Sequence, residues 1–324
     1  MKKRTFVLIV AAVVAVVACS SGNDGKNKEK KEKEKTLYVA VEGGKCGFID
    51  KTGKMVIEPQ FDVASEFREG LAAVRIGSFE TGKVGYIDTE GKFVINPIYD
   101  DAYDFSEGLS RVRIGDINTG KWGYIDRNGK MVIEPQFSDA LGFQDGLAPV
   151  KIGDRETGKW GYIDKTGKVV IEPKFFYASI FGDGLAPVYV FDTMKSLYKG
   201  GFVDRNGDFV IEPIYDGVGM FKEGLAAVMK DGKWGFIDKK GNMVIKPRFD
   251  YTGYFSDGLV LVSIFNGDSN KWGYVDKKGK AVIGFRYDVA YLFVDGLALV
   301  RLGDEKTGKY MRIDKEGNVV WKEN

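Results

Sequence analysis

From Thr36 onward, one sequence unit recurs along the chain. An aspartate that follows isoleucine or valine marks each copy, and the residue numbers of successive aspartates differ by 38, 38, 38, 40, 34, 38 and 38. They are Asp50, Asp88, Asp126, Asp164, Asp204, Asp238, Asp276 and Asp314. A unit this short cannot bury an apolar face by itself, so neighbouring copies must stack on one another. This periodicity therefore restricts the chain to a repeat fold of eight similar units.

One copy, "KWGYIDKTGKVVIEP" at residues 159–173, contains two apolar stretches around the turn residues DKTG. In such a turn the aspartate can accept hydrogen bonds from the backbone and the glycine can adopt a positive φ, which predicts a hairpin. A third strand is predicted at "GLAPVKI" (146–152), and the link 174–184 is expected to be irregular. We expect the proline to mark the end of the hairpin, because proline cannot donate to a ladder. These prolines are Pro59, Pro97, Pro135, Pro173, Pro213 and Pro247, and Phe285 replaces the proline in the seventh copy.

The unit varies in length at one place. The numbering advances by 11 from Val74 to Gly85, by 13 from Val188 to Gly201, and by 7 from Val228 to Gly235. Differences by even numbers keep every side chain on its own face of a hairpin. The two strands are therefore predicted to pair, with a tip of variable length. Variable tips on a constant scaffold are candidate binding loops, and they are residues 77–83, 115–121, 153–159, 189–200, 229–233, 263–271 and 303–309.

The repeated unit, KWGYIDKTGKVVIEPKF followed by FxDGLAPV, resembles the WG (KWG) repeat family of bacterial proteins, and the resemblance covers essentially residues 37–324. It implies a β-rich repeat protein, often exported, and it implies no established activity. The residues themselves predict about eight three-stranded units, an all-β fold rich in glycine, tyrosine and phenylalanine. Sheets of this size that stack on similar sheets fit a β-propeller, and the alternative is an open β-solenoid.

Residues 1–18 have the features of an export signal. Lys2, Lys3 and Arg4 precede a run from Phe6 to Ala18 that has no polar side chain. A run of this length suits the core of a signal peptide better than a permanent membrane span. The sequence "VVACSS" that follows resembles a bacterial lipoprotein signal, which implies cleavage before Cys19 and attachment of acyl chains such as palmitate to it. An ordinary secretory signal is the alternative.

Residues 19–36 are predicted to form a tether between the lipid and the repeat domain, residues 37–324. The stretch "SSGNDGKNKEKKEKEK" (20–35) has no apolar side chain that could fold against another surface. A solvated spacer is favoured over an electrostatic contact with the membrane, because its lysines alternate with acidic residues. Ser20 is not the aspartate that often retains lipoproteins on the inner membrane, so we expect an outer-membrane location in a cell with two membranes.

The composition argues against several classes of function. The chain has no histidine, which weighs against catalytic triads and most transition-metal sites. Without Lys2, Lys3 and Arg4 the formal net charge of +2 becomes −1, so a nucleic-acid partner is not indicated. The repeated aspartates are interpreted as turn residues and not as calcium ligands. We therefore expect no catalytic residue, no metal and no cofactor.

Other repeated side chains have a structural and a functional interpretation. Four tryptophans could stack on sugars, but cysteine, valine and glycine occupy the same position in other copies, which favours core packing. They are Trp122, Trp160, Trp234 and Trp272. Cys46 is interpreted as a small substitute for this tryptophan. The glutamates before the prolines show no acid and base pair, and they are Glu58, Glu134, Glu172 and Glu212.

The tip "YVFDTMKSLYKG" (189–200) differs from the others because it is apolar. Its candidate binding residues are Tyr189, Phe191, Met194, Leu197 and Tyr198. They could anchor a partner or cover the edge of a neighbouring unit. Two functions follow from the sequence. The first is a membrane-anchored, non-catalytic scaffold that binds a protein or another envelope component through its loops, and the alternative is a lectin-like module that binds carbohydrate through aromatic residues.

Overall fold

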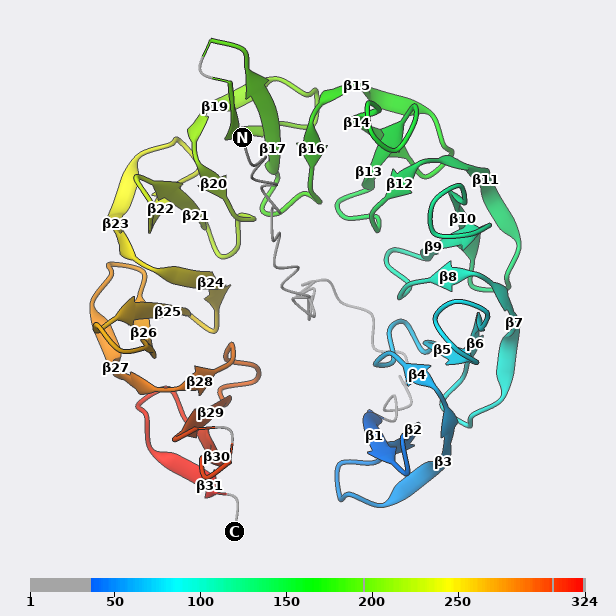
Figure 1. Ribbon diagram of the computed structural model, residues 1–324, viewed down its shortest axis with the longest axis horizontal. Helices are drawn as coiled ribbons and strands as arrows, with labels where there is room; N and C mark the ends of the chain where they lie inside the picture. Colours follow the sequence, from blue (N-terminus) through cyan, green and yellow to red (C-terminus); the bar gives the residue numbers. More distant parts are fainter. Residues whose placement is uncertain (1–35, 195, 305, 323–324) are drawn as a thin grey trace, which may run out of the picture. The chain divides into compact units, whose positions relative to one another are not determined.

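The chain folds into eight small antiparallel sheets that follow one another around a ring, as Figure 1 shows. The computed structural model describes residues 36–322 except residues 195 and 305, and among these residues every regular element is a β-strand. The predicted β-propeller of eight units is confirmed, and each sheet is called a blade below. The predictions for residues 1–35, including acylation of Cys19, lie outside the described part of the chain. No helix that could cross a membrane occurs among the described residues.

Four strand positions recur from the axis of the ring outward. The innermost strands are β4 (Val63–Ala64), β8 (Asp101–Ala102), β12 (Asp139–Ala140), β16 (Tyr177–Ala178), β20 (Gly217–Val218), β24 (Tyr251–Ser256) and β28 (Val289–Ala290). The second strands are β1 (Tyr38–Glu42), β5 (Ala72–Ile76), β9 (Leu109–Ile114), β13 (Leu147–Ile152), β17 (Ala186–Asp192), β21 (Leu225–Lys230), β25 (Leu259–Phe265) and β29 (Ala298–Leu302). The third strands are β2 (Lys45–Ile49), β6 (Lys83–Ile87), β10 (Lys121–Asp126), β14 (Lys159–Asp164), β18 (Leu197–Val203), β22 (Lys233–Asp238), β26 (Asn270–Asp276) and β30 (Lys309–Ile313). The outer strands are β3 (Met55–Phe61), β7 (Phe93–Tyr99), β11 (Met131–Phe137), β15 (Val169–Phe175), β19 (Phe209–Tyr215), β23 (Met243–Phe249), β27 (Ala281–Tyr287) and β31 (Val319–Lys322).

The innermost strand is an addition to the predicted unit of three strands. Blades 2 to 8 have four strands, whereas blade 1 has three described strands, β1 to β3. The fourth strand comes from the link that was expected to be irregular. In blade 4, Asp139 pairs with Lys151 and Ala140 with Val150. Such a short strand is enough to satisfy backbone groups at the inner edge, but it is too short to produce a recognisable pattern of alternation.

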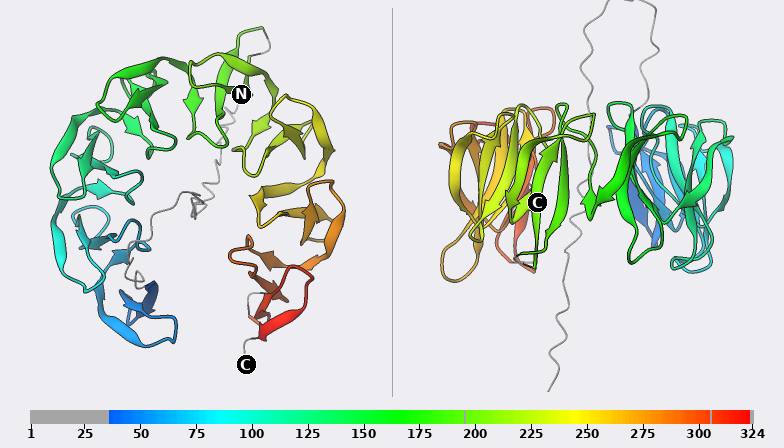
Figure 2. Two further views of the ribbon diagram at one scale, coloured as in Figure 1. Left: turned by 180° about the vertical axis from the view of Figure 1, so that it is seen from behind. Right: turned by 90° about the horizontal axis from the view of Figure 1, so that it is seen from above.

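The predicted hairpin between the second and third strands is confirmed in every blade. Val74 pairs with Gly85, Val188 with Gly201 and Val228 with Gly235, in the register that the odd separations require. Successive strands run in opposite directions across the thickness of the ring, so the connecting loops gather on its two sides (Figure 2). The variable tips lie on one side, which we call the tip side, together with the connections from each outer strand to the next blade.

The repeated aspartates accept hydrogen bonds from the backbone of the turns between the third and outer strands, as the sequence predicted. Asp164 accepts hydrogen bonds from the Thr166 amide at 2.9 Å and from the Lys168 amide at 3.1 Å. The Thr166 hydroxyl also donates to Asp164, and these bonds hold the pKa of the carboxyl below its ordinary value. The same pair of amide bonds, from the second and fourth residues after the aspartate, recurs in all eight turns.

The prediction that the prolines end the hairpins was wrong. Pro173 lies inside the outer strand β15 and not at its end. This strand is at the outer edge of the blade, where a residue without an N–H removes no ladder bond. Around the proline the strand bulges. Trp160 pairs with Phe175 and Tyr162 pairs with Ile171, so an advance of two residues along β14 corresponds to four residues along β15.

The glycine of each WG pair lies where this bulge crosses the third strand. We call Gly47, Gly85, Gly123, Gly161, Gly201, Gly235 and Gly273 the motif glycines. A Cβ atom on Gly161 would lie 2.5 Å from the carbonyl oxygen of Ile171 and 2.9 Å from the backbone nitrogen of Pro173. At all seven positions this Cβ would lie 2.4 to 2.6 Å from the carbonyl oxygen of the equivalent isoleucine. A side chain larger than hydrogen therefore cannot fit without moving the outer strand.

Each blade packs one face against the next blade. We call this its forward face, and the opposite face its rear face. Between blades 3 and 4, one core combines the forward face of blade 3 with the rear face of blade 4, and its buried residues are Leu109, Trp122, Tyr124, Ile133, Phe137, Ala140, Phe143, Ala148, Val150 and Ile163. The Tyr124 ring lies 4.9 Å from that of Phe143, and its hydroxyl donates to the carbonyl of Leu141 at 2.7 Å. Polar and apolar contacts thus join the same two blades.

We expect Gly161→Ala to destabilise the fold strongly, because its methyl group would overlap the backbone of the outer strand. The free energy of unfolding should fall by about 1 to 3 kcal/mol, measured by urea denaturation. Gly284→Ala is the matched control, because a Cβ there would have no neighbour within 4 Å. Equal stability of the two variants would contradict the proposed crossing.

We also expect the fold to lose stability in alkali because of its buried tyrosines. Burial raises the pKa of Tyr124 above its ordinary value, so the unfolded chain loses this proton at a lower pH than the folded chain. The free energy of unfolding is therefore unaffected below about pH 10 and falls as the pH rises further.

Tyr124→Phe tests this effect, since Phe202 and Phe236 hold the same position in blades 5 and 6. The variant should lose about 1 kcal/mol near neutral pH with its hydrogen bond. Its decline above about pH 10 should be shallower than that of the wild type, measured by urea denaturation across the pH range. An equally steep decline would show that Tyr124 contributes nothing to alkaline unfolding.

Candidate functional site

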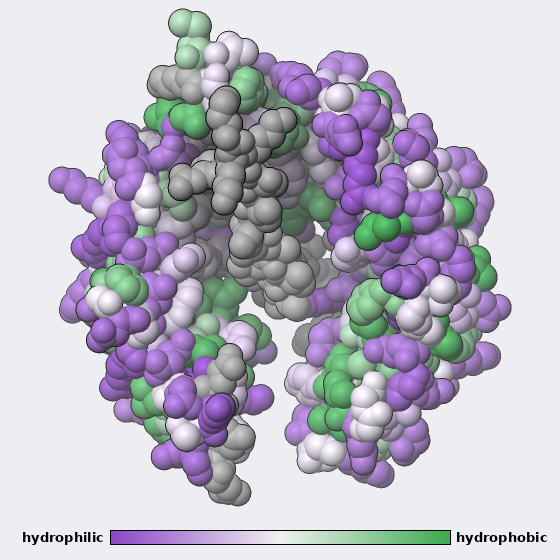
Figure 3. Space-filling model, viewed as in Figure 1, coloured by the Kyte–Doolittle hydropathy of each residue, from purple (hydrophilic) through white to green (hydrophobic). Residues whose placement is uncertain are grey.

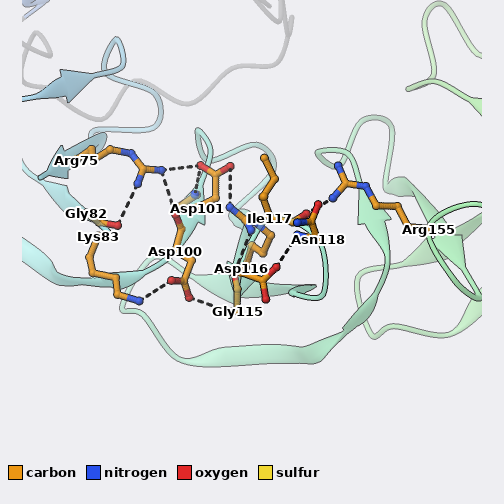
Figure 4. Close-up of polar contacts among 12 residues, drawn as sticks. Arg75, Gly82, Lys83, Asp100, Asp101, Gly115, Asp116, Ile117, Asn118 and Arg155 are labelled. Atoms are coloured by element: carbon orange, nitrogen blue, oxygen red, sulfur yellow. Dashed lines mark hydrogen bonds and ion pairs between the residues drawn. The ribbon is translucent and has the colours of Figure 1, made fainter. Parts of the chain in front are cut away.

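On the tip side, the residue that follows each outer strand is usually an aspartate, and it joins the tip of its own blade to the tip of the next blade. Asp100 accepts a hydrogen bond from the Lys83 ammonium at 2.6 Å and another from the Gly115 amide at 2.8 Å (Figure 4). We call this arrangement the lysine–aspartate latch. The same latch recurs as Lys45–Asp62, Lys199–Asp216, Lys233–Asp250 and Lys271–Asp288. The Lys233 ammonium, followed by the Phe265 amide, lowers the pKa of Asp250, so these carboxylates remain charged in the latch.

Two consecutive repeats break this pattern. Ser138 and Phe176 stand where the other repeats have the aspartate of the latch. Lys159, the counterpart of Lys83, is exposed and faces a position without a carboxylate. The ring of Phe176 is 42% exposed. It cannot accept the two hydrogen bonds that the latch aspartate accepts in other repeats. Phe176, between blades 4 and 5, is therefore the single aromatic residue at a position where the scaffold alone would favour aspartate.

Phe176 forms part of an aromatic cluster with the longest hairpin tip. Its ring stacks on that of Tyr198, with centroids 3.9 Å apart and planes 29° apart. The Phe191 ring also contacts Tyr198, with centroids 5.0 Å apart. We call Phe176, Phe191 and Tyr198 the aromatic patch. Contacts between rings fix their orientation while leaving apolar surface in water, which is typical of a preformed binding surface.

The structure separates the five candidate residues of the tip into two groups. Phe191, Leu197 and Tyr198 are 46%, 52% and 45% exposed, and Met194 is 92% exposed. Figure 3 shows hydrophobic side chains over this hairpin, at the top of the view. Tyr189 belongs to the scaffold instead, because its hydroxyl accepts a hydrogen bond from the Val218 amide of blade 6 at 2.9 Å.

A hollow of about 360 Å³ lies beside the aromatic patch, between blades 4 and 5. Trp160, Phe176 and Tyr177 supply its aromatic walls, and Asp139, Lys151, Arg155 and Glu156 supply charged groups. The rings of Trp160 and Tyr177 meet edge to face at 5.4 Å. The Arg155 guanidinium donates to the carbonyl of Ile117 in the tip of blade 3 (Figure 4). This hydrogen bond fixes the position of Arg155 at the side of the hollow. The hollow and the patch share Phe176.

The sequence interpretation did not include Phe176 and Tyr177, although a signal was present. Aligning the residue three places after each proline, or after Phe285, gives aspartate in five repeats and departures at Ser138 and Phe176. Charged residues that recur in register point to a structural role, and a single aromatic residue in the same place marks a local change of role. Comparing the repeats position by position would have found this site.

The tryptophans occupy the packing positions that the sequence predicted. Trp122 and Trp160 are 9% and 4% exposed, and each belongs to a core between two blades. Trp234 and Trp272 are partly buried against the equivalent cores. Cys46 pairs with Phe61 in the same register and is also partly buried. Of these side chains, Trp160 also lines the hollow.

Within residues 36–322, excluding the two that are not described, no group of three acidic or cysteine side chains is placed to hold a metal ion. The glutamates before the prolines point outward from the edge strands, with an exposed side chain in each case.

The profile of the family described as "WG containing repeat" matches residues 47–78, 85–116, 122–155, 160–190, 201–234, 234–267 and 272–310. The chain belongs to this WG-repeat family. No curated protein matches the chain. Among solved structures, a chain described as the eukaryotic initiation factor is similar to this WG-repeat protein, with 12% identity and a TM-score of 0.64. The match covers 90% of the present chain and 85% of the other.

Two peptidases are also similar in structure. A prolyl endopeptidase has 11% identity and a TM-score of 0.53, and the match covers 80% of the WG-repeat protein and 49% of the enzyme. Prolyl oligopeptidase B from Galerina marginata has 11% identity and a TM-score of 0.50, and the match covers 82% of the WG-repeat protein and 50% of the enzyme. The WG-repeat chain thus spans about half of the length of these enzymes. Identities this low show the shared propeller fold alone.

Proposed function

We propose that this WG-repeat protein is a non-catalytic scaffold that is anchored to the cell envelope by lipid on Cys19 and binds a protein partner through the aromatic patch of blade 5. The observation that carries the binding role is the replacement of the latch aspartate by Phe176, which stacks on Tyr198 at 3.9 Å. Side chains that serve only the scaffold repeat from blade to blade, whereas this cluster occurs at a single place among the described blades.

The chemistry of the patch fits a protein interface. Aromatic rings provide large apolar contact areas at a small cost in conformational entropy, and buried aromatic anchors account for most of the affinity in many interfaces. The five latches tie neighbouring tips to one another, so we expect little ordering of the backbone on binding. The exposed Met194 at the tip can adapt to the shape of a partner.

The proposed anchor follows from the sequence of residues 1–36. Each buried methylene of an acyl chain contributes about 0.8 kcal/mol, so several chains hold a protein durably on a membrane. The charged stretch 20–35 would then keep the propeller at a distance from the lipid surface. With Ser20 after the cysteine, we propose the outer membrane as the location.

A carbohydrate ligand is the second candidate, and the hollow between blades 4 and 5 favours it. Aromatic walls next to carboxylates and cationic groups provide both a stacking surface and hydrogen-bonding partners for hydroxyl groups. Tyr177, 39% exposed, would carry this stacking. Tyr177→Ala should then abolish binding to an array of purified glycans, whereas the protein-binding proposal expects no specific binding to such an array.

The variant Phe176→Asp tests the protein-binding proposal. It removes the stacked ring and restores the latch to Lys159 that five other repeats have, so the free energy of unfolding should stay within about 1 kcal/mol of the wild type. Ser138→Asp is the matched control, because it makes the same restoration opposite Lys121 without touching the patch.

A photoreactive benzoylphenylalanine in place of Met194 reports the partner in cells. We expect one defined protein adduct that Phe176→Asp removes and Ser138→Asp retains, with the adduct identified by mass spectrometry. An adduct that survives Phe176→Asp, or that both substitutions remove, would contradict binding through the aromatic patch.

The anchor is tested separately by Cys19→Ser. Because this change removes the proposed site of acylation, the protein should no longer incorporate labelled palmitate. Cys46→Val is the control, since it also removes one thiol and places at this position the residue that blade 2 has at Val84. Incorporation of labelled palmitate by the Cys19→Ser protein would contradict the lipid anchor without affecting the binding proposal.

A further inference from the structure

Among the described blades, the first and the last each have one face that does not pack on another described blade. Seven times along the chain, the forward face of one blade packs on the rear face of the next. Blades 1 and 8 are the two ends of this series (Figure 1). The forward face of blade 8 and the rear face of blade 1 therefore remain, and they can be compared with their seven internal counterparts residue by residue.

The first comparison concerns the glycine of the turn between the third and outer strands. In all seven internal seams it lies against the isoleucine of the previous outer strand, and a Cβ on Gly129 would lie 3.3 Å from side-chain atoms of Ile95. The other pairs are Gly91–Ile57, Gly167–Ile133, Gly207–Ile171, Gly241–Ile211, Gly279–Ile245 and Gly317–Ile283. In blade 1 the same glycine, Gly53, would have no neighbour within 4 Å. The isoleucine position of blade 8 is Trp321, which is 49% exposed.

The second comparison concerns an ion pair between neighbouring blades. Glu107 of blade 3 pairs with Lys165 of blade 4 at 3.2 Å, and Glu223 of blade 6 pairs with Lys277 of blade 7 at 3.1 Å. In both pairs the glutamate precedes the glycine that opens the second strand, and the lysine follows the turn aspartate. At the two ends of the ring these positions are Asp295 and Lys51, which are both exposed and of opposite charge.

The third comparison concerns the apolar surface. A hollow of about 680 Å³ on the forward face of blade 8 is lined by Tyr291, Leu297, Leu299, Tyr310, Arg312, Val320 and Trp321. In blades 2 and 3 the position of Arg312 is a buried tyrosine, and Tyr86 meets Ser110 of the next blade at 2.6 Å. The counterpart of Ser110 in blade 1 is Tyr38, which is 46% exposed. A guanidinium can stack on a tyrosine ring, as Arg111 does on Tyr103 at 3.7 Å.

We propose that blade 8 docks on blade 1 of the same chain and closes the ring by face-to-face packing, without a shared strand. Trp321 then fills the space over Gly53, Arg312 stacks on Tyr38, and Asp295 pairs with Lys51. The same chain is the expected partner because the two faces belong to one molecule, so their association is intramolecular and needs no partner in solution. Blade 8 presents a forward face and blade 1 presents a rear face, which are the two kinds of face that pack together at every internal seam.

Cysteine pairs across the seam test this proposal in the full-length protein with Cys19→Ser and Cys46→Val, which remove both native thiols. Gly53→Cys with Trp321→Cys should form a disulfide within one chain on mild oxidation, detected by its mobility on non-reducing gels and by peptide mass. Gly129→Cys with Ile95→Cys is the matched control at an internal seam. The yield of cross-linked monomer should equal that of the control and should not depend on protein concentration.

A second pair keeps the test independent of any strain at Gly53. Lys51→Cys with Asp295→Cys changes two exposed side chains and should be joined by a short bismaleimide, as should Lys165→Cys with Glu107→Cys. Cross-linked dimers that increase with protein concentration would show that the end faces pair between two copies, which overturns the proposal. Failure of both seam pairs to cross-link while both controls react would also overturn it.

Discussion

The close approach of each outer strand to a motif glycine determines the geometry of this propeller. With no side chain on Gly161, the bulge around Pro173 can cross the third strand at a distance where a methyl group would lie 2.5 Å from a carbonyl oxygen. The crossing turns the outer strand toward the next blade, so it sets the path of the chain from one unit to the following one. In blade 8, Met311 stands in place of the glycine and pairs with Lys322.

Packing between blades depends on this path. Once the outer strand has delivered the chain to the next unit, a large forward face meets a rear face of small residues, as Tyr162 and Phe175 meet Ala178 and Val188. The tyrosine hydroxyls extend across the seam to backbone carbonyls, for example from Tyr162 to Ser179 at 2.8 Å. Because these contacts fix most side chains of the unit, freedom to vary remains mainly at the tips, where the aromatic patch lies.

Much of the fold could be predicted from the sequence because the controlling features are local and repeated. The odd separations fixed the register of the hairpins, and the turn aspartates bind the backbone as expected. The innermost strands could not be predicted, since two residues such as Asp139 and Ala140 are too few to show the alternation of apolar and polar side chains that identifies a strand. The prolines were misplaced because an edge strand and the end of a strand tolerate proline for the same reason.

The candidate site was predictable in part. The apolar composition of residues 189–200 indicated an unusual tip, and Phe191, Leu197 and Tyr198 are exposed there. Tyr189 was included because hydrophobicity alone does not distinguish a side chain that bonds the next blade from one that faces solvent. Phe176 was missed because its significance appears only when it is compared with the aspartates at the same position. Its partner Tyr198 is also distant in the sequence, in β18, whereas Phe176 lies between β15 and β16.

The stability of Gly273→Ala tests the role of the crossing most directly. Blade 7 has Gly284 and Phe285 in place of glutamate and proline, yet its outer strand still bulges and a Cβ on Gly273 would lie 2.6 Å from the carbonyl oxygen of Ile283. If the backbone crossing requires the glycine, urea denaturation should show a loss of about 1 to 3 kcal/mol even without the proline. A variant as stable as the wild type would show that the proline, and not the crossing, makes the glycine necessary.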